Sequence, residues 1–120
     1  DTVAILEFFR IEQGGWILDP SNTVWREWPF TFALPASECA GASGDTIVVQ
    51  GIIDLLVRTA GGLAVIDFKT DRITAEQVAE RAEFYRRQLE LYSRAACAIL
   101  KAKPAGSWLY FLTCGVCVEV

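Results

Sequence analysis

The 120-residue sequence predicts a single α/β domain, with its elements in the order helix, strand, strand, strand, helix, strand, strand. Two apolar, β-branched runs, Thr46–Arg58 and Leu63–Lys69, flank the turn-forming segment Thr59-Ala-Gly-Gly62, and this pattern predicts a central β-hairpin. A long run with helical periodicity starts at Thr74. With 52% hydrophobic residues, the chain can bury one core but is too short for two.

Composition excludes some classes of protein. No apolar run approaches the length of about 18 residues that a membrane span needs, so no span is expected. A net charge of -4 argues against a nucleic-acid binder that relies on its own basic surface, but not against a nucleic-acid enzyme with a metal ion at its site. The chain starts at Asp1 and contains no methionine, so we expect a fragment of a longer protein.

The N-terminal part is predicted to be one short helix followed by irregular chain. Apolar residues recur at helical spacing over Thr2–Gln13, and Gly14-Gly15 is expected to end this helix. The stretch Trp16–Thr23 is predicted to be irregular, with a turn at Asp19-Pro-Ser-Asn22.

The first strand is predicted over Val24–Leu34, because aromatic residues alternate along it. Pro29 restricts this strand to a sheet edge or a bulge. Glu27 is its carboxylate, and it fits a solvated edge charge as well as an accessory position near a metal ion. The small, polar stretch Pro35–Asp45 is expected to be a surface loop.

Each strand of the hairpin carries a carboxylate where an apolar residue is expected, and an unpaired buried carboxylate is costly. A two-residue turn at Ala60-Gly61 places Asp54 opposite Asp67, whereas a turn at Gly61-Gly62 places Asp54 opposite Lys69. Because side chains alternate along a strand, each of these registers places all three side chains on one face.

Two opposed carboxylates repel each other unless a cation lies between them. Opposed Cβ atoms in a hairpin are roughly 4.5–5.5 Å apart. Oxygen ligands without nearby His or Cys suit Mg²⁺ or Mn²⁺, so Asp54 and Asp67 are candidate metal ligands. Lys69 beside that metal could stabilise developing charge or help to position a water.

The long helix is predicted to begin with a capping box, Thr74 at the N-cap and Gln77 at N3, and to run to about Lys101. Pro104 and Gly106 close it. One apolar stripe is expected to face the sheet. Its members are Val78, Ala82, Tyr85, Leu89, Tyr92, Ala96 and Ile99.

Gln88 and Tyr92 are four residues apart on this helix and should project together. A lone glutamine is more often a solvated surface amide, so this alternative carries more weight from the spacing alone. The chain is expected to end in a hairpin formed by Ser107–Thr113 and Val116–Val120 around Cys114-Gly115.

The four cysteines favour no metal site. Cys114 and Cys117 have CxxC spacing, but a second pair is missing and the chain has no histidine to replace it. Together with Cys39 and Cys97, they are predicted to be reduced, partly buried thiols of a cytosolic protein.

Three motifs follow one another on strand, strand and helix: Gly51-Ile-Ile-Asp54, Asp67-Phe-Lys69-Thr70 and Gln88-Leu-Glu-Leu-Tyr92. In this order they resemble the RecB-like nucleases of the PD-(D/E)xK superfamily. A closer likeness is to the C-terminal nuclease domain of the AddA subunit of bacterial AddAB helicase-nucleases, which extends to the segment Arg26-Glu-Trp-Pro-Phe30. The resemblance covers roughly Arg26–Val120.

The resemblance implies a restriction-endonuclease-like fold, with a mixed central sheet flanked by helices (an αβββαβ core) and a C-terminal hairpin. It implies Asp54 and Asp67 as metal ligands, the backbone carbonyl of Phe68 as a third ligand and Lys69 as the catalytic lysine. Gln88 and Tyr92 would orient the site and the DNA backbone, and Thr70 would support the loop.

Such nucleases often take a further ligand, commonly histidine, from an upstream helix. Since this chain has no histidine, that element lies outside it, or water or Glu27 takes its place.

The resemblance also implies a cytoplasmic, Mg²⁺-dependent deoxyribonuclease domain, with Mn²⁺ as a substitute. It would act as an exonuclease within an ATP-dependent helicase-nuclease for repair of double-strand breaks by recombination. DNA, the remainder of the helicase chain and a second subunit would be its partners, with no membrane. Two alternatives remain open: a catalytically silent module that binds DNA or a partner, and a stand-alone nuclease with another substrate such as RNA.

Overall fold

A five-stranded mixed sheet forms the centre of the computed structural model, which describes residues 2–35 and 46–120. The strands lie in the spatial order β1-β2-β3-β4-β5, with β3 and β4 parallel and every other neighbouring pair antiparallel. Their bounds are β1 Thr23–Pro35, β2 Thr46–Thr59, β3 Gly62–Lys69, β4 Pro104–Phe111 and β5 Val116–Glu119. The predicted α/β class and the predicted strand order along the chain are confirmed. Apart from Pro35, the loop predicted before β2 lies outside the described residues.

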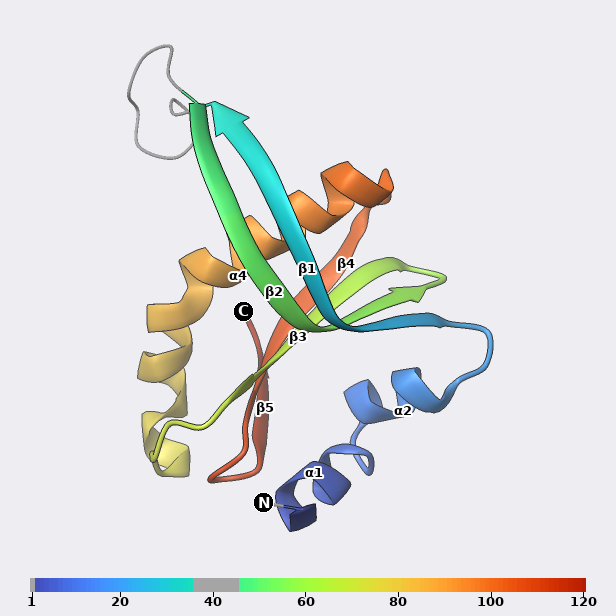
Figure 1. Ribbon diagram of the computed structural model, residues 1–120. Coiled ribbons are helices and arrows are strands. Elements are labelled where there is room, and N and C mark those ends of the chain that lie inside the picture. The colour runs from blue at the N-terminus through green and yellow to red at the C-terminus, as the bar shows by residue number, and fades with distance from the viewer. Residues whose placement is uncertain (1, 36–45) are drawn as a thin grey trace.

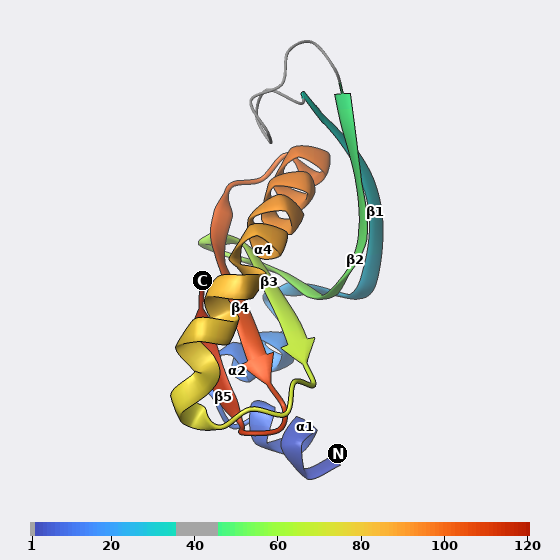
Figure 2. The same ribbon diagram turned by 90° about the vertical axis from the view of Figure 1, so that its left-hand side faces the viewer.

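Helices cover both faces of this sheet (Figures 1 and 2). The long helix α4, Val78–Leu100, follows the short 3-10 turn η1, Ala75–Gln77, and connects β3 to the parallel β4. It packs on the larger of two buried apolar clusters, the α4-side cluster, which includes Ile53, Leu56 and Leu89. The helices α1, Thr2–Phe8, and α2, Glu12–Leu18, pack on the second cluster. Among the described residues, no helix is both long and apolar enough to cross a membrane.

The N-terminal region differs from the single helix that the periodicity predicted. The helix α1 ends at Phe8, and α2 runs through Gly14 and Gly15 to Leu18 instead of stopping at the glycines. A Cβ atom on Gly14 would lie 2.1 Å from the carbonyl oxygen of Phe8. The glycine therefore permits close contact between α2 and the end of α1. Sequence rules for a single helix do not predict such a contact between two helices. The turn predicted from Asp19 is present after α2.

The first strand lies at the sheet edge, so the position predicted for Pro29 is confirmed. β1 and β2 bend sharply partway along their length (Figure 1). Backbone pairing joins Arg26 to Leu55 and Trp28 to Ile53, which leaves Glu27 between them with a positive φ of 48°. Non-glycine residues rarely adopt this conformation, and it marks a local irregularity of the edge strand.

The hairpin has the register that a turn at Ala60-Gly61 predicts, because Thr59 pairs with Gly62. Regular pairing then continues along the two strands as far as Leu55 and Ile66. Extension of this register by one residue places Asp54 opposite Asp67.

The capping box at the start of the long helix is confirmed, and the side-chain Oε1 of Gln77 accepts a hydrogen bond from the Thr74 backbone N–H at 2.9 Å. The helix ends at Leu100, one residue before the predicted end. The predicted apolar stripe is wrong for Ile99, which is 41% exposed. Leu100 packs against the core in its place, because it follows Ala96 by four residues and so lies on the same helix face.

The C-terminal hairpin of β4 and β5 is confirmed, with its turn over residues 112–115. Cys97, Cys114 and Cys117 are free and half-buried, as predicted for reduced thiols. Burial raises the pKa of Cys117 to about 11, so this thiol is neutral and unreactive at neutral pH. Cys39 lies outside the described residues.

Candidate active site

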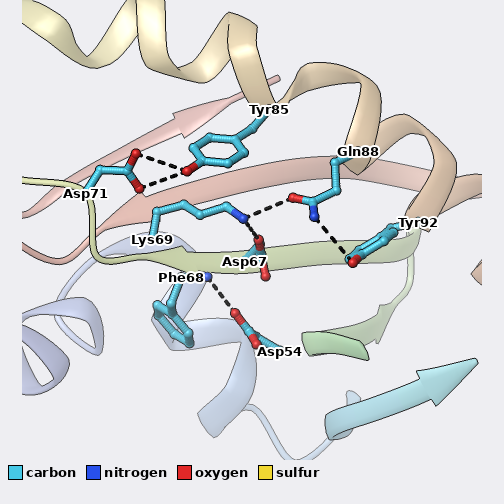
Figure 3. A network of polar contacts seen from close by, with 8 residues as sticks. All are labelled: Asp54, Asp67, Phe68, Lys69, Asp71, Tyr85, Gln88 and Tyr92. Carbon is cyan, nitrogen blue, oxygen red and sulfur yellow. Dashed lines mark hydrogen bonds and ion pairs between the residues drawn. The ribbon is translucent and has the colours of Figure 1, made fainter. Parts of the chain in front are cut away.

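Side chains from β2, β3 and α4 converge where the regular pairing of the hairpin ends (Figure 3). The ammonium Nζ of Lys69 lies 2.7 Å from Oδ2 of Asp67 and donates a hydrogen bond of 3.0 Å to Oε1 of Gln88. The Lys69 side chain is 15% exposed. A half-buried lysine with two polar partners is a specific arrangement, because an ammonium is costly to remove from water without partners.

The two carboxylates are neighbours. Oδ2 of Asp54 accepts a hydrogen bond from the Phe68 backbone N–H at 2.9 Å, so a side chain continues the strand contact beyond the last backbone pair. Burial raises the pKa of Asp67 to about 7, the Asp54 carboxylate adds to this increase, and Lys69 opposes it.

A position between these carboxylates fits a divalent cation. The Asp54 carboxylate opposes ionisation of Asp67, and a cation between the two would relieve this repulsion. Their oxygen atoms are hard ligands that suit Mg²⁺ or Mn²⁺, and the sequence has no histidine for a softer site. Within residues 2–35 and 46–120, no three side chains of His, Cys, Asp or Glu are grouped closely enough to hold a metal.

Gln88 and Tyr92 project together, as their spacing predicts, and the Gln88 amide donates to the Tyr92 hydroxyl over 3.4 Å. Gln88 is half-buried against Lys69, so the alternative of a solvated surface amide is wrong. The Tyr92 ring lies edge-on to Phe30 and against the backbone of Gly51. A Cβ atom on Gly51 would lie 2.8 Å from the phenol, which explains why glycine occupies this position three residues before Asp54.

Glu27 is brought near one carboxylate but not into the polar cluster. It is exposed and lines a cavity of about 570 Å³ with Arg26, Asp54 and Phe68, on the side of the sheet that carries α1 and α2. Its role as an accessory ligand stays a prediction. Thr70 is exposed immediately after β3, and its role also stays a prediction.

Two polar residues beside Lys69 were not predicted to belong to the site. The Lys69 ammonium lies 4.0 Å from the centroid of the Tyr85 ring, and the Tyr85 hydroxyl donates to Asp71. Helical spacing predicts Tyr85 only as a member of the apolar stripe. Its position three residues before Gln88 places both side chains on the same helix face, and this spacing is the sequence signal from which its place in the site could have been predicted.

Comparison with known proteins agrees with this geometry. Residues 6–116 match the family model of the PD-(D/E)XK nuclease superfamily. The chain is 39% identical to the A subunit of an ATP-dependent helicase/nuclease from Bacillus velezensis, over 96% of its own length and 10% of the relative. It is also 39% identical to the protein of the same name from Moorella thermoacetica, over 100% of the chain and 9% of the relative. The chain thus spans about a tenth of the length of these relatives. Enzymes of this superfamily generally use divalent metal ions. Given the match over most of its length and the convergence of Asp54, Asp67 and Lys69, the chain belongs to the PD-(D/E)XK nuclease superfamily.

Proposed function

We propose that this chain is a Mg²⁺-dependent nuclease domain that hydrolyses phosphodiester bonds of DNA, with Mn²⁺ able to replace Mg²⁺. The observation that carries the proposal is the meeting of Asp54, Asp67, Lys69 and Gln88, which come from three separate elements. Two carboxylates beside a half-buried lysine fit metal-assisted hydrolysis of a phosphate ester better than a purely structural ion pair.

Each residue has a distinct role in this proposal. Asp54 and Asp67, with the carbonyl of Phe68, would hold the metal, and the Phe68 N–H orients Asp54. When bound, the divalent ion supplies positive charge beside the phosphate and lowers the pKa of a water. Lys69 would stabilise the negative charge that develops on the phosphate. Gln88 directs the Lys69 ammonium through its Oε1 atom, and Tyr92 holds the Gln88 amide.

The similar proteins suggest the setting of the reaction. Since these relatives are named as A subunits of ATP-dependent helicase/nucleases, we infer that the chain works as one domain of a longer cytoplasmic helicase-nuclease. Such an enzyme would act as an exonuclease on DNA ends during repair of double-strand breaks by recombination, together with a second subunit. The net charge of -4 supports this dependence, because an acidic domain holds DNA weakly by itself.

The deciding experiment measures cleavage of a labelled DNA oligonucleotide by the full-length protein with Mg²⁺, with Mn²⁺ and with a chelator. We expect cleavage with either metal and none with the chelator. In parallel, calorimetry should detect Mn²⁺ binding to the parent, and binding should be lost in Asp67→Ala. Equal Mn²⁺ affinity in Asp67→Ala would contradict the ligand assignment.

Other outcomes would identify the alternatives. Binding of DNA without cleavage under every metal condition would indicate a catalytically silent module. Preferential cleavage of RNA would indicate a nuclease with another substrate. In fluorescence anisotropy at physiological salt, the 120-residue chain should bind DNA much more weakly than the full-length protein. Tight, salt-resistant binding by the chain alone would contradict the proposed dependence on neighbouring domains.

A further inference from the structure

We propose that Tyr85 is a positioning residue for Lys69: its ring covers one side of the lysine ammonium, and Asp71 holds the ring in place. The kinetic predictions of this inference rest on the proposed nuclease function. The contact between Tyr85 and Lys69 can be tested without any reaction.

Three side chains surround the Lys69 ammonium, and the Tyr85 ring is the third. Asp67 and Gln88 approach Nζ at 2.7 and 3.0 Å, and the centroid of the Tyr85 ring lies 4.0 Å away. This distance is well within the range of about 6 Å over which an aromatic face attracts a cation. Figure 3 shows Tyr85 reaching from α4 toward the Lys69 side chain. The ring therefore restricts the long, flexible lysine on a side where neither polar partner lies.

The ring is itself fixed at its far end. The Tyr85 hydroxyl lies 3.0 Å from each carboxylate oxygen of Asp71 and donates to this carboxylate. Burial and the neighbouring Asp71 raise the pKa of Tyr85, so the phenol remains a proton donor at neutral pH. Tyr85 thus links the catalytic lysine to a carboxylate two residues further along the chain.

Asp71 has its own supports from separate segments. Arg81 on α4 forms an ion pair of 3.5 Å with its carboxylate. Thr113, in the turn between β4 and β5, donates its hydroxyl to the Asp71 backbone carbonyl. This carbonyl also accepts a hydrogen bond from the Ile73 N–H at 3.0 Å. Asp71 is therefore anchored well enough to orient the ring.

The arrangement is most important when the site is loaded. Asp67 would then direct its carboxylate toward the metal ion, and Gln88 and Tyr85 would remain to hold Lys69 in place. Removal of the ring should therefore disturb the chemical step more than substrate binding. We expect Tyr85→Leu to lower kcat by about 10- to 30-fold, from the typical strength of a desolvated cation–π contact, with KM changed by less than about twofold.

Conservative variants separate positioning from general destabilisation. Tyr85→Phe keeps the ring face and should restore kcat to within about threefold of the parent. Asp71→Ala should lower kcat by about three- to tenfold, whereas Asp71→Asn, which can still accept a hydrogen bond, should restore most of this loss. Phe84→Leu is the matched control, because Phe84 is 71% exposed, touches the edge of the Tyr85 ring and should have no effect.

NMR provides a readout that does not depend on activity. The chain contains three lysines, of which Lys101 and Lys103 are exposed and serve as internal references. In ¹³C-lysine-labelled protein without metal, the ε-methylene protons of Lys69 should be shifted upfield by the ring current of Tyr85. We expect this shift to disappear in Tyr85→Leu and to persist in Tyr85→Phe and in Phe84→Leu.

The kcat and NMR measurements together distinguish failure of the positioning role from failure of the proposed nuclease function. A parental upfield shift that survives in Tyr85→Leu, or a Tyr85→Leu kcat within about twofold of the parent, would overturn the positioning role. If Tyr85→Leu does not fold, the Asp71→Ala and Asp71→Asn pair decides the question, because equal kcat and equal Lys69 shifts in these two variants would overturn the role. Absence of DNA cleavage by the parent would instead count against the proposed function, and the NMR result would still decide whether the ring covers Lys69.

Discussion

The two halves of the β2–β3 hairpin differ in their backbone pairing and in the kind of side chains that they carry. In the half next to the turn, backbone pairing is regular from Thr59 and Gly62 to Leu55 and Ile66, and the apolar side chains are almost fully buried. In the half with the site, carboxylates and a lysine replace apolar residues, and the bond from Phe68 to Asp54 continues the contact between strands. Burial of apolar side chains stabilises the first half, whereas the second half brings charged groups together at the proposed active site.

This comparison predicts opposite consequences for substitutions in the two halves. A change near the turn should reduce the free energy of unfolding and leave the chemistry of the folded molecules intact. A change near the site should reduce activity and leave the fold nearly intact. Natural sequences depart from local folding rules chiefly at functional sites, and Asp54 and Asp67 are such departures.

The largest expected effect is that of Lys69→Ala in the site half. If the ammonium acts on the transition state, cleavage by the full-length protein should fall by about 10³-fold, with Mn²⁺ affinity and Tm nearly unchanged. Lys103→Ala, which removes an exposed lysine, is the matched control and should keep the parental rate. Cleavage at the parental rate by Lys69→Ala would contradict the catalytic role of Lys69 and the proposed difference between the two halves of the hairpin.

In the turn half, Leu56→Ala should act on stability instead. Leu56 is fully buried in the α4-side cluster, so its truncation leaves a cavity and should cost about 2–5 kcal/mol of unfolding free energy. Urea unfolding of parent and variant measures this cost. The fraction that remains folded at low temperature should cleave DNA at the parental kcat. A lowered kcat in fully folded Leu56→Ala would mean that the two halves are not separable.

Gly51→Ala tests the link between the edge of the site and α4. Because the new Cβ would meet the Tyr92 phenol at 2.8 Å, the ring must move, and Gln88 would lose its hydrogen bond to the Tyr92 hydroxyl. We expect a loss of about 1–3 kcal/mol in unfolding free energy, as is usual for overpacking, together with a lower kcat. Gly15→Ala is the control, since a Cβ there meets nothing within 4 Å, and it should be neutral or slightly stabilising. Equal behaviour of both variants would contradict the close contact with Tyr92.

A pH dependence of stability is also expected in metal-free protein. The folded state raises the pKa of Asp67 from 3.8 to about 7, so between these values it binds more protons than the unfolded state. The free energy of unfolding should therefore fall as pH rises through this window, and Asp67→Asn should remove this contribution.

Urea unfolding at about pH 5 and about pH 8, with a chelator present, measures the slope. Asp19→Asn is the control, because hydrogen bonds from Ser21 lower the pKa of Asp19, and this residue titrates below the measured range. An identical slope in parent and Asp67→Asn would show that Asp67 does not take up the proton.

The register of the hairpin and the placement of the long helix could be predicted from local patterns. The Thr59–Gly62 turn sets which residues of β2 and β3 face each other, and the Thr74 capping box sets where the helical region begins. The pairing of Gln88 with Tyr92 follows from helix geometry alone. These features depend on residues a few positions apart, so local sequence patterns are sufficient to predict them.

Other features depend on contacts between distant segments, and the tertiary structure alone decided them. Ile53 and Leu56 both pack in the α4-side cluster, although strict alternation places them on opposite faces. The strand β2 therefore shifts its facing between these residues, beside the positive φ of Glu27 on β1. The chain breaks into two helices near Gly14 because α2 packs against the end of α1. Tyr85 has the spacing of a core residue, and its contact with Lys69 appears only when α4 lies across the sheet. Periodicity shows which residues share a face, whereas the packing of one element on another determines which residues those faces meet.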